Sequence, residues 1–195
     1  MTTKSSFNLN FRPATKGDAG YIAKLYSISS DGVADYIWTQ LADDNEDIFE
    51  VGKKRYEREE TAFSYQNCTI AEVNGAIVGM LVAFPLFVDP DETVEDPVLA
   101  PYSQLEIDNS YYICGVALFE PYRGQGIGRA LMALAERHAK EKGFNTLSLI
   151  VFEKNYGAKK LYDQLGYKEV KRSAIYPHPL IHFDGDAILM AKKLR

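Results

Sequence analysis

Hydrophobic residues recur along this chain with two different periods, and the change of period predicts its elements. Short runs that are apolar throughout or at alternate positions predict strands over 9–15, Tyr111–Leu118, Leu147–Phe152, Tyr167–Tyr176 and Ala187–Lys192. Two further runs, Cys68–Val73 and Ala76–Phe84, flank Asn74-Gly75, a pair that suits the positive φ angles of a two-residue type I′ turn. The pattern therefore predicts an antiparallel hairpin in the first half of the chain.

Helical spacing of apolar residues fills most of the segments between these strands. Thr15 and Asp18 resemble a capping box that opens a helix through about Ser30, and residues 31–60 predict one or two more helices. Later amphipathic segments end at Gly143 and at Gly166. Residues 86–110 place three prolines among acids, which predicts a long irregular segment with a short helical turn. We expect one mixed α/β (α+β) domain over residues 1–195.

Three glycines at alternate positions, Gly124, Gly126 and Gly128, separate the strand Tyr111–Leu118 from the helix that follows. Glycine there predicts a tight turn whose amides face a ligand. Free amides at the positive end of a helix suit a phosphate or pyrophosphate, and Arg123 and Arg129 flank them. The dinucleotide fingerprint fails at Arg129, and no Walker lysine is present. The alternative is a glycine-rich connection that binds nothing.

Composition excludes several other classes of protein. The chain has 195 residues, is 46% hydrophobic and carries a formal net charge of −5, which supports a full core and argues against a nucleic-acid binder. It has no apolar run near the roughly 18 residues that span a bilayer, and its N-terminus lacks the apolar segment of a secretion signal, so we expect a cytoplasmic protein without membrane contact. Cys68 and Cys114 lie in apolar runs, which favours buried thiols over a disulfide or a metal site.

Charge is divided unevenly along the chain. Residues 1–122 carry a net charge of −12 and residues 123–195 a net charge of +7, and no Lys or Arg occurs from Ser64 to Tyr122. Two readings stay open. The charges either lie on solvated faces, or they serve two ligands: residues 123–195 would bind an anionic ligand and residues 1–122 a cationic one.

Two motifs in chain order resemble the GNAT superfamily of N-acetyltransferases. The stretch RGQGIG at 123–128 resembles the superfamily's R/Q-x-x-G-x-G/A segment. The stretch NYGAKKLYDQLGY at 155–167 resembles its N-x-x-A-x-x-L-Y-x-x-x-G-[FY] signature. FRPATKGDAGYIAKL, at 11–25, is similar to its first strand and helix. The resemblance covers nearly the whole chain, with 31–60 and 86–110 the least typical parts.

The resemblance implies the GNAT fold: a central mixed, mostly antiparallel sheet of six to seven strands, flanked by helices and splayed at the cofactor site. It also implies acetyl-CoA as the co-substrate. Backbone groups of Val116 and Leu118, at the end of the splayed strand, would bind the pantetheine arm. The pyrophosphate would be held by the loop and the first helical turn, which comprise Arg123, Gly124, Gln125, Gly126, Ile127, Gly128 and Arg129.

Two residues of the second motif receive roles from the same resemblance. Asn155 would hydrogen-bond the cofactor arm, and it also suits the first position of a helix as an ordinary cap. Tyr162 lies seven residues later on the same helix face, so both side chains can point at the cofactor. A tyrosine hydroxyl beside the sulfur could protonate the CoA thiolate that leaves, although a core tyrosine is the alternative.

The residue that deprotonates the amine is not singled out by the sequence. Some N-terminal acetyltransferases of this family carry Glu five residues before the helix-opening Asn, where this chain has Ile150, which argues against a ribosomal-protein or N-terminal-peptide substrate. Weak candidates near the preceding strand and in the last hairpin are Asp108, Tyr111, Tyr112, His178 and His182.

The acceptor pocket in this family is built from the first helices and neighbouring loops. Here those are Asp31–Glu60, with Tyr36 and Trp38, and the acidic stretch Asp89–Asp96. Acidic and aromatic surface suits an organic cation, which predicts a small cationic primary amine as acceptor. A protein or peptide acetyltransferase and a non-catalytic acyl-CoA-binding sensor are the alternatives. The family's exposed strands often form dimers, so a homodimer stays open.

Overall fold

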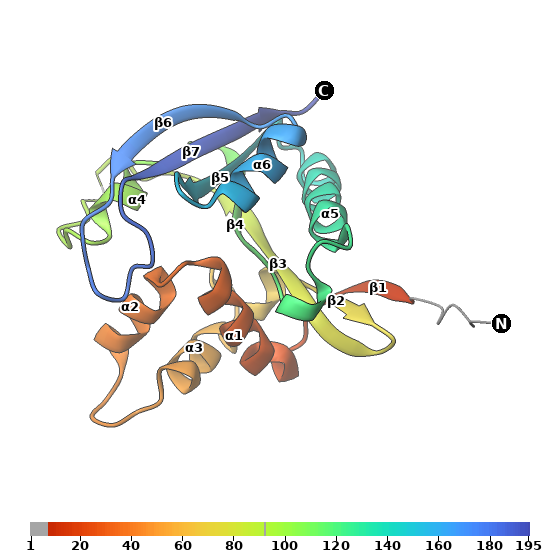
Figure 1. Ribbon diagram of the computed structural model, residues 1–195, viewed down its shortest axis with the longest axis horizontal. Helices are drawn as coiled ribbons and strands as arrows, with labels where there is room; N and C mark the ends of the chain where they lie inside the picture. Colours follow the sequence, from red (N-terminus) through yellow and green to blue (C-terminus); the bar gives the residue numbers. More distant parts are fainter. Residues whose placement is uncertain (1–7, 92) are drawn as a thin grey trace.

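The structure, a computed structural model, describes residues 8–91 and 93–195. Seven strands form one sheet in the order β1-β2-β3-β4-β5-β7-β6, in which β4 and β5 are parallel and every other neighbouring pair is antiparallel (Figure 1). The strands are β1 (Leu9–Pro13), β2 (Cys68–Val73), β3 (Ala76–Leu86), β4 (Ser110–Leu118), β5 (Thr146–Phe152), β6 (Lys168–Ala174) and β7 (Asp186–Lys193). The mixed, mostly antiparallel sheet expected from the sequence is confirmed.

Six α-helices flank the sheet in the described part of the chain. They are α1 (Ala19–Ser29), α2 (Val33–Leu41), α3 (Ile48–Tyr56), α4 (Ala100–Ser103), α5 (Ile127–Glu141) and α6 (Tyr156–Gln164). Residues 31–60 thus form two helices, and α4 is the short helical turn expected within the irregular segment 86–110. No helix among the described residues is long and apolar enough to cross a bilayer.

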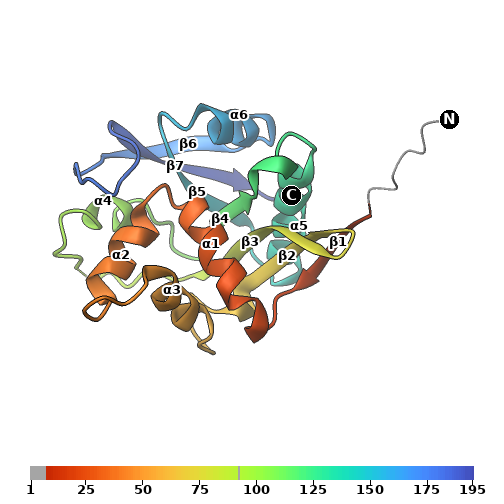
Figure 2. The ribbon, with the colours of Figure 1, turned by 60° about the horizontal axis from the view of Figure 1, so that its bottom comes forward.

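The sheet separates two layers of helices, as Figures 1 and 2 show. Strand periodicity explains this arrangement, because successive side chains of β3 point to opposite faces. Leu81 and Ala83 pack in the cluster that includes α5. Met80 and Val82 pack in the cluster that includes α1 and α3. Both faces of β3 are therefore buried.

Trp38 belongs to the core and not to the acceptor surface. Its side chain is 1% exposed, and a Cβ added to Gly52 of α3 would lie 2.8 Å from its ring. The expectation that Trp38 offers an aromatic surface to the acceptor is therefore wrong: a large apolar ring on α2 is stabilised more by burial against α1 and α3 than by exposure. Tyr36 is also largely buried, but its hydroxyl reaches Asp96, donating a hydrogen bond at 2.9 Å.

The sheet splays in the middle. β4 pairs with β5 only over Tyr111–Ile113, which face Leu147–Leu149. Its later residues keep their pairing with β3 but have no partner on the β5 side. The register of β3 and β4 also shifts at Val82/Ala83, which leaves Cys114 as an extra residue on β4. The splay that the family resemblance implied is confirmed, and it frees backbone groups of β4 just before the glycine-rich connection.

An ion pair fixes the entry to α1. Arg12 of β1 binds Asp18 with an Nη1–Oδ2 distance of 2.8 Å, and Asp18 also accepts the backbone N–H of Thr15 at 2.7 Å. The expected capping box is present, although it opens a single 3-10 turn, Lys16–Asp18, from which α1 continues. Both predicted thiols are free, with Cys68 buried and Cys114 partly buried. The Tyr26 hydroxyl lies 3.0 Å from the sulfur of Cys114.

Candidate functional site

The connection from β4 to α5 holds two left-handed glycines next to free amides. Gly124 has φ +73° and Gly126 has φ +84°, and a Cβ at either position would meet nothing within 4 Å. Gly126 precedes α5 and supplies no side-chain cap. The first intrahelical bond is that of the Ala130 N–H, so the amides of 127–129 are left for another acceptor. Glycine is thus required by the turn, and the amides of 127–129 have no hydrogen-bond acceptor among the described residues.

Gly128 behaves differently from the other two. It lies within α5 and does not have a positive φ. A Cβ there would lie 3.8 Å from Leu161 of α6 and 4.0 Å from Leu118, which are ordinary contacts. The sequence pattern grouped three glycines, but only Gly124 and Gly126 need their conformational freedom. Gly128 instead marks where α6 packs against the beginning of α5.

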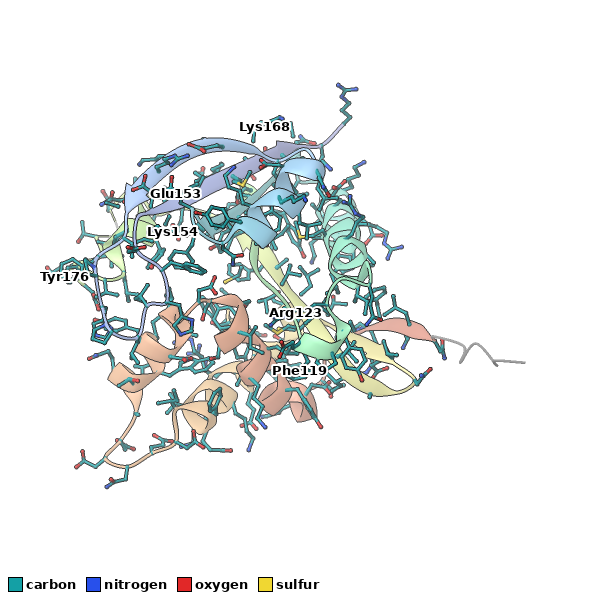
Figure 3. All side chains as sticks on the ribbon, in the orientation of Figure 1. Phe119, Arg123, Glu153, Lys154, Lys168 and Tyr176 are labelled. Atoms are coloured by element: carbon teal, nitrogen blue, oxygen red, sulfur yellow. The ribbon has the colours of Figure 1, made fainter. Side chains whose placement is uncertain are left out.

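The polar side chains of this connection bind the protein itself. Arg123 Nε donates to the carbonyl of Leu118 at 3.0 Å, which fixes the end of β4, and Gln125 Nε2 donates to Pro121 O at 2.9 Å. Arg129 donates to the Gln164 side chain of α6 at 2.7 Å. Figure 3 shows Arg123 beside this connection, close to α1. The Arg123 side chain therefore holds the loop against the end of β4.

The end of β4 presents backbone to the splay. Val116 pairs with Leu81 and Leu118 with Gly79, both on the β3 side. Leu118 is buried in the core, whereas Val116 is half-buried. Their side chains therefore serve packing, as the sequence suggested, and only their main-chain groups can meet a ligand between β4 and β5.

Asn155 and Tyr162 are carried by α6 on the other side of the splay. Asn155 Oδ1 accepts the N–H of Ala158 at 3.2 Å, so the side chain caps α6 as expected. Its amide Nδ2 donates to Asp31 Oδ2 at 3.1 Å. Burial, and secondarily the negative charge of Asp31, raises the pKa of Tyr162 to about 12. The Tyr162 hydroxyl is therefore protonated at neutral pH and can serve as a proton donor.

The three weak base candidates on or near β4 lie in the first half of that strand or in the turn before it. Asp108 Oδ1 accepts the N–H of Val88 at 3.0 Å, and Tyr111 is 3% exposed, with its hydroxyl donating to Ala83 O at 3.2 Å. Burial raises the pKa of Tyr112 well above its usual range. Tyr112 lies one residue before the point at which β4 and β5 separate, and the charge of Tyr162 contributes to its raised pKa.

The two histidines of the β6–β7 loop lie closer to the site. His178 packs edge-on against Tyr36, with ring centroids 4.7 Å apart. The backbone N–H of His182 donates to the carbonyl of Asp31 at 3.0 Å. The loop therefore closes over the junction of α1 and α2, as Figure 1 shows. Ile150, which occupies the position of the family's occasional Glu, is half-buried and pairs with Leu189.

Asp31 is a site residue that the sequence did not single out. It reaches Asn155 across 124 positions of sequence, and such a contact cannot be read from spacing. The one local signal was the Asp31-Gly32 pair itself, because both dipeptide positions favour turns. Within residues 8–91 and 93–195, no group of three His, Cys, Asp or Glu side chains is suited to hold a metal ion.

Comparison with known proteins assigns the family. The model of the "Acetyltransferase (GNAT) family" matches residues 35–167, more than half of the chain and the whole of both motifs. The chain therefore belongs to the GNAT family of acetyltransferases. The fold, the splayed β4 and the uncapped amides of α5 agree with that assignment.

Two curated relatives match parts of the chain. An uncharacterized N-acetyltransferase, YycN, of Bacillus subtilis is 41% identical over 58 residues, or 30% of this chain and 37% of the relative. The [ribosomal protein bS18]-alanine N-acetyltransferase of Haemophilus influenzae is 40% identical over 65 residues, or 33% of this chain and 44% of the relative. The chain thus spans less than half the length of these relatives.

Solved structures share the fold over nearly the full length. An agmatine N-acetyltransferase mutant in its apo form has a TM-score of 0.68 at 14% identity, with coverage of 95% of this chain and 99% of that one. A GNAT family acetyltransferase from Elizabethkingia anophelis with acetyl-CoA bound has a TM-score of 0.59 at 18% identity, with coverage of 96% and 99%. At these identities the likeness concerns the fold.

Proposed function

We propose that this protein transfers the acetyl group of acetyl-CoA to a primary amine, and that the acceptor is a small organic cation. The observation that carries the proposal is the pair of left-handed glycines, Gly124 and Gly126, which leave the first amides of α5 uncapped beside a splayed β4. Family membership and the acetyl-CoA bound to a structural neighbour support the same co-substrate.

The chain offers two kinds of contact to such a co-substrate, and Arg123 positions the second of them. Uncapped amides of α5 would bind the pyrophosphate, because anions are stabilised at a helix N-terminus by directed N–H groups and by the helix dipole. Main-chain groups of Val116 and Leu118 would bind the pantetheine arm. Arg123 would keep the end of β4 in place through its bond to Leu118 O.

Tyr162 is proposed to be the general acid. When the amine attacks the thioester, the C–N bond forms, the C–S bond breaks and the sulfur leaves with the electron pair. A hydroxyl whose pKa is about 12 is fully protonated at neutral pH and can give its proton to that sulfur. Its position on α6, next to Leu161, which contacts the beginning of α5, supports this role.

The acceptor preference rests on charge. Acidic side chains of the segment before α4, Asp89, Asp91 and Glu95, are exposed on the strongly acidic part of the chain. A cationic acceptor would be attracted to this region and a CoA anion to the basic part. One solved neighbour is an agmatine acetyltransferase, which fits a small cation, although a likeness at 14% identity adds only the fold.

A thiol-release assay tests the acid. Tyr162→Phe is expected to lower kcat by about 100-fold or more with a cationic amine, because general acid catalysis contributes roughly 10²–10⁴-fold, while the affinity for acetyl-CoA stays within about twofold. Tyr156→Phe on the same helix is the matched control, since Tyr156 is 74% exposed, and it should keep wild-type rates. Equal rates for Tyr162→Phe and wild type would contradict the role.

A peptide substrate is the second candidate. The relative named for alanine acetylation of ribosomal protein bS18 supports it at 40% identity over 65 residues. Ile150 in place of a carboxylate speaks against it. If a peptide with a free N-terminal alanine outcompetes small amines at equal concentration, this candidate replaces the small cation.

A further inference from the structure

Two loops hold Asp31 in a left-handed conformation at the turn between α1 and α2. Asp31 has φ +50° and Gly32 has φ +98°. A Cβ on Gly32 would lie 1.8 Å from the carbonyl oxygen of Leu180, so the turn and the β6–β7 loop are in direct backbone contact. The His182 N–H also binds the Asp31 carbonyl at 3.0 Å. A non-glycine residue in this conformation costs about 1 kcal/mol, which the packing of the two loops offsets.

The Asp31 carboxylate points at the element that carries the proposed acid. Its Oδ2 accepts a hydrogen bond from Asn155 Nδ2 at 3.1 Å, and Asn155 is the cap of α6, where Tyr162 lies. Three segments far apart in sequence, the α1–α2 turn, the β6–β7 loop and the beginning of α6, therefore meet at Asp31, the loop through its backbone carbonyl and α6 through its carboxylate.

The surroundings of this carboxylate compensate its charge only in part. Burial raises the pKa of Asp31, while the Asn155 hydrogen bond and the charges of His182 and Arg123 act in the opposite direction. Within the described residues, no Lys, Arg or His forms an ion pair with it. The titratable or charged groups that face it are His182 from the β6–β7 loop, Arg123 from the β4–α5 connection, Tyr102 of α4 and Tyr162 of α6.

The charge of this carboxylate acts on two tyrosines, Tyr162 of α6 and Tyr102 of α4. The negative charge of Asp31 contributes to the raised pKa of both Tyr162 and Tyr102, although burial is the larger cause in each. The Tyr102 hydroxyl is buried and has no hydrogen-bond partner in the part of the chain that the structure describes. A half-buried carboxylate that forms no ion pair with the described residues, near a hydroxyl that also lacks a partner among them, is stabilised by a ligand that supplies a positive charge and a donor.

We propose that Asp31 binds the ammonium group of the acceptor and takes its first proton, so that the neutral amine forms next to Tyr162. The inference rests on the proposed function and names its acceptor contact. The proposal requires an acceptor that arrives as an ammonium ion. A neutral amine or a hydroxyl acceptor would not need a carboxylate to take this proton.

The protons balance as follows. The acceptor, R–NH₃⁺, gives one proton to the Asp31 carboxylate, and the nitrogen lone pair then forms the C–N bond while the C–S bond breaks. Tyr162 gives its proton to the sulfur, and the second proton of the nitrogen restores Tyr162. Asp31 releases the first proton to solvent. One R–NH₃⁺ and one acetyl-CoA thus yield the amide, CoA thiol and one proton.

Asp31→Asn tests the proposal with little disturbance of the fold, because Asn tolerates left-handed φ as well as Asp does and can still accept from Asn155. We expect kcat/KM for agmatine to fall by about 100-fold or more and its acid limb, set by the carboxylate, to disappear. For trifluoroethylamine, which is neutral at pH 7.5, the fold-decrease in kcat/KM caused by Asp31→Asn should be less than about a tenth of the fold-decrease for agmatine. Glu60→Gln is the matched control, since Glu60 is an exposed acid with φ +55° away from this turn, and it should keep wild-type rates.

Each result decides one of the two claims. If wild type acetylates agmatine and Asp31→Asn does so within twofold, with the same pH profile, the role of Asp31 is overturned and the proposed function stands. If wild type releases no CoA thiol with any amine, the proposed function is overturned and the role of Asp31 with it. Calorimetric binding of acetyl-CoA, expected to be equal in wild type and Asp31→Asn, shows that the variant is folded.

Discussion

Arg12 and the buried Asp18 show how one ion pair positions the beginning of α1. Asp18 is 6% exposed, and its hydrogen bond with Arg12 is the main reason that its pKa falls from 3.8 to about 2. Arg12 also binds Glu72 of β2 at 2.7 Å, so β1, β2 and the entry to α1 are joined by one guanidinium. Asp31 follows shortly after the end of α1, so the position of α1 helps to determine the position of the Asp31 carboxylate.

The pH dependence of unfolding tests this pair. A carboxylate whose folded pKa is lowered stabilises the fold above its unfolded pKa and loses that contribution as pH falls toward the folded value. From pH 5 to pH 2, wild type should therefore lose about 2 kcal/mol more unfolding free energy than Asp18→Asn, measured by urea titration. The exposed Asp44→Asn variant should follow wild type. Parallel curves for wild type and Asp18→Asn would show that the pair adds no stability.

Single residues also mark the limit of what the sequence reveals. Trp38 and Tyr36 are two positions apart on one helix, and only tertiary packing decides that Trp38 is fully enclosed by α1 and α3. Asn155 and Tyr162 were expected from the family resemblance, which rests on a motif that lies within one short segment. Asp31 was missed because its partner lies 124 positions away.

At the scale of elements, local pattern was sufficient. The strands and helices correspond to the predicted segments because the hydrophobic periodicity of each one is contained in its own sequence. The splay of β4 from β5 came from the family resemblance, since strand spacing and register depend on partners that no single segment specifies.

The beginning of α5 makes a testable element-scale claim. Gly126→Ala would force an L side chain to φ +84° and is expected to shift the turn, which should weaken acetyl-CoA binding by about tenfold in calorimetry. Gly143→Ala at the other end of α5 is the matched control, because Gly143 has φ +80° and a Cβ there also meets nothing within 4 Å. It should lose stability but not affinity, and equal affinity in the two variants would disprove the role of the α5 amides.

The whole molecule divides its charge between the two proposed ligands. The N-terminal part to residue 122, at −12, carries the α1–α2 turn and the acidic segment before α4, whereas the part from residue 123, at +7, carries α5 and α6. Such a division favours opposite charges on acceptor and CoA and raises their local concentration at the site.

Salt should weaken this long-range attraction. Between about 0.05 M and about 0.5 M ionic strength, kcat/KM for a dication such as agmatine is expected to fall several-fold, while that for a neutral amine changes by less than about twofold. Initial rates of thiol release at constant pH measure both. If kcat/KM for the two amines depends on salt in the same way, long-range charge attraction does not determine the choice of acceptor.

A competition in one vessel tests the proposed reaction most directly. Wild-type protein and acetyl-CoA are mixed with equal concentrations of agmatine, a neutral amine, an acidic amino acid and an alanine-initiated peptide, and the acetylated products are identified by mass spectrometry. We predict that N-acetylated agmatine is the main product. Acetylation mainly of the peptide or of the acidic amino acid, or no acetylated product at all, would contradict an acetyltransferase for small cationic amines.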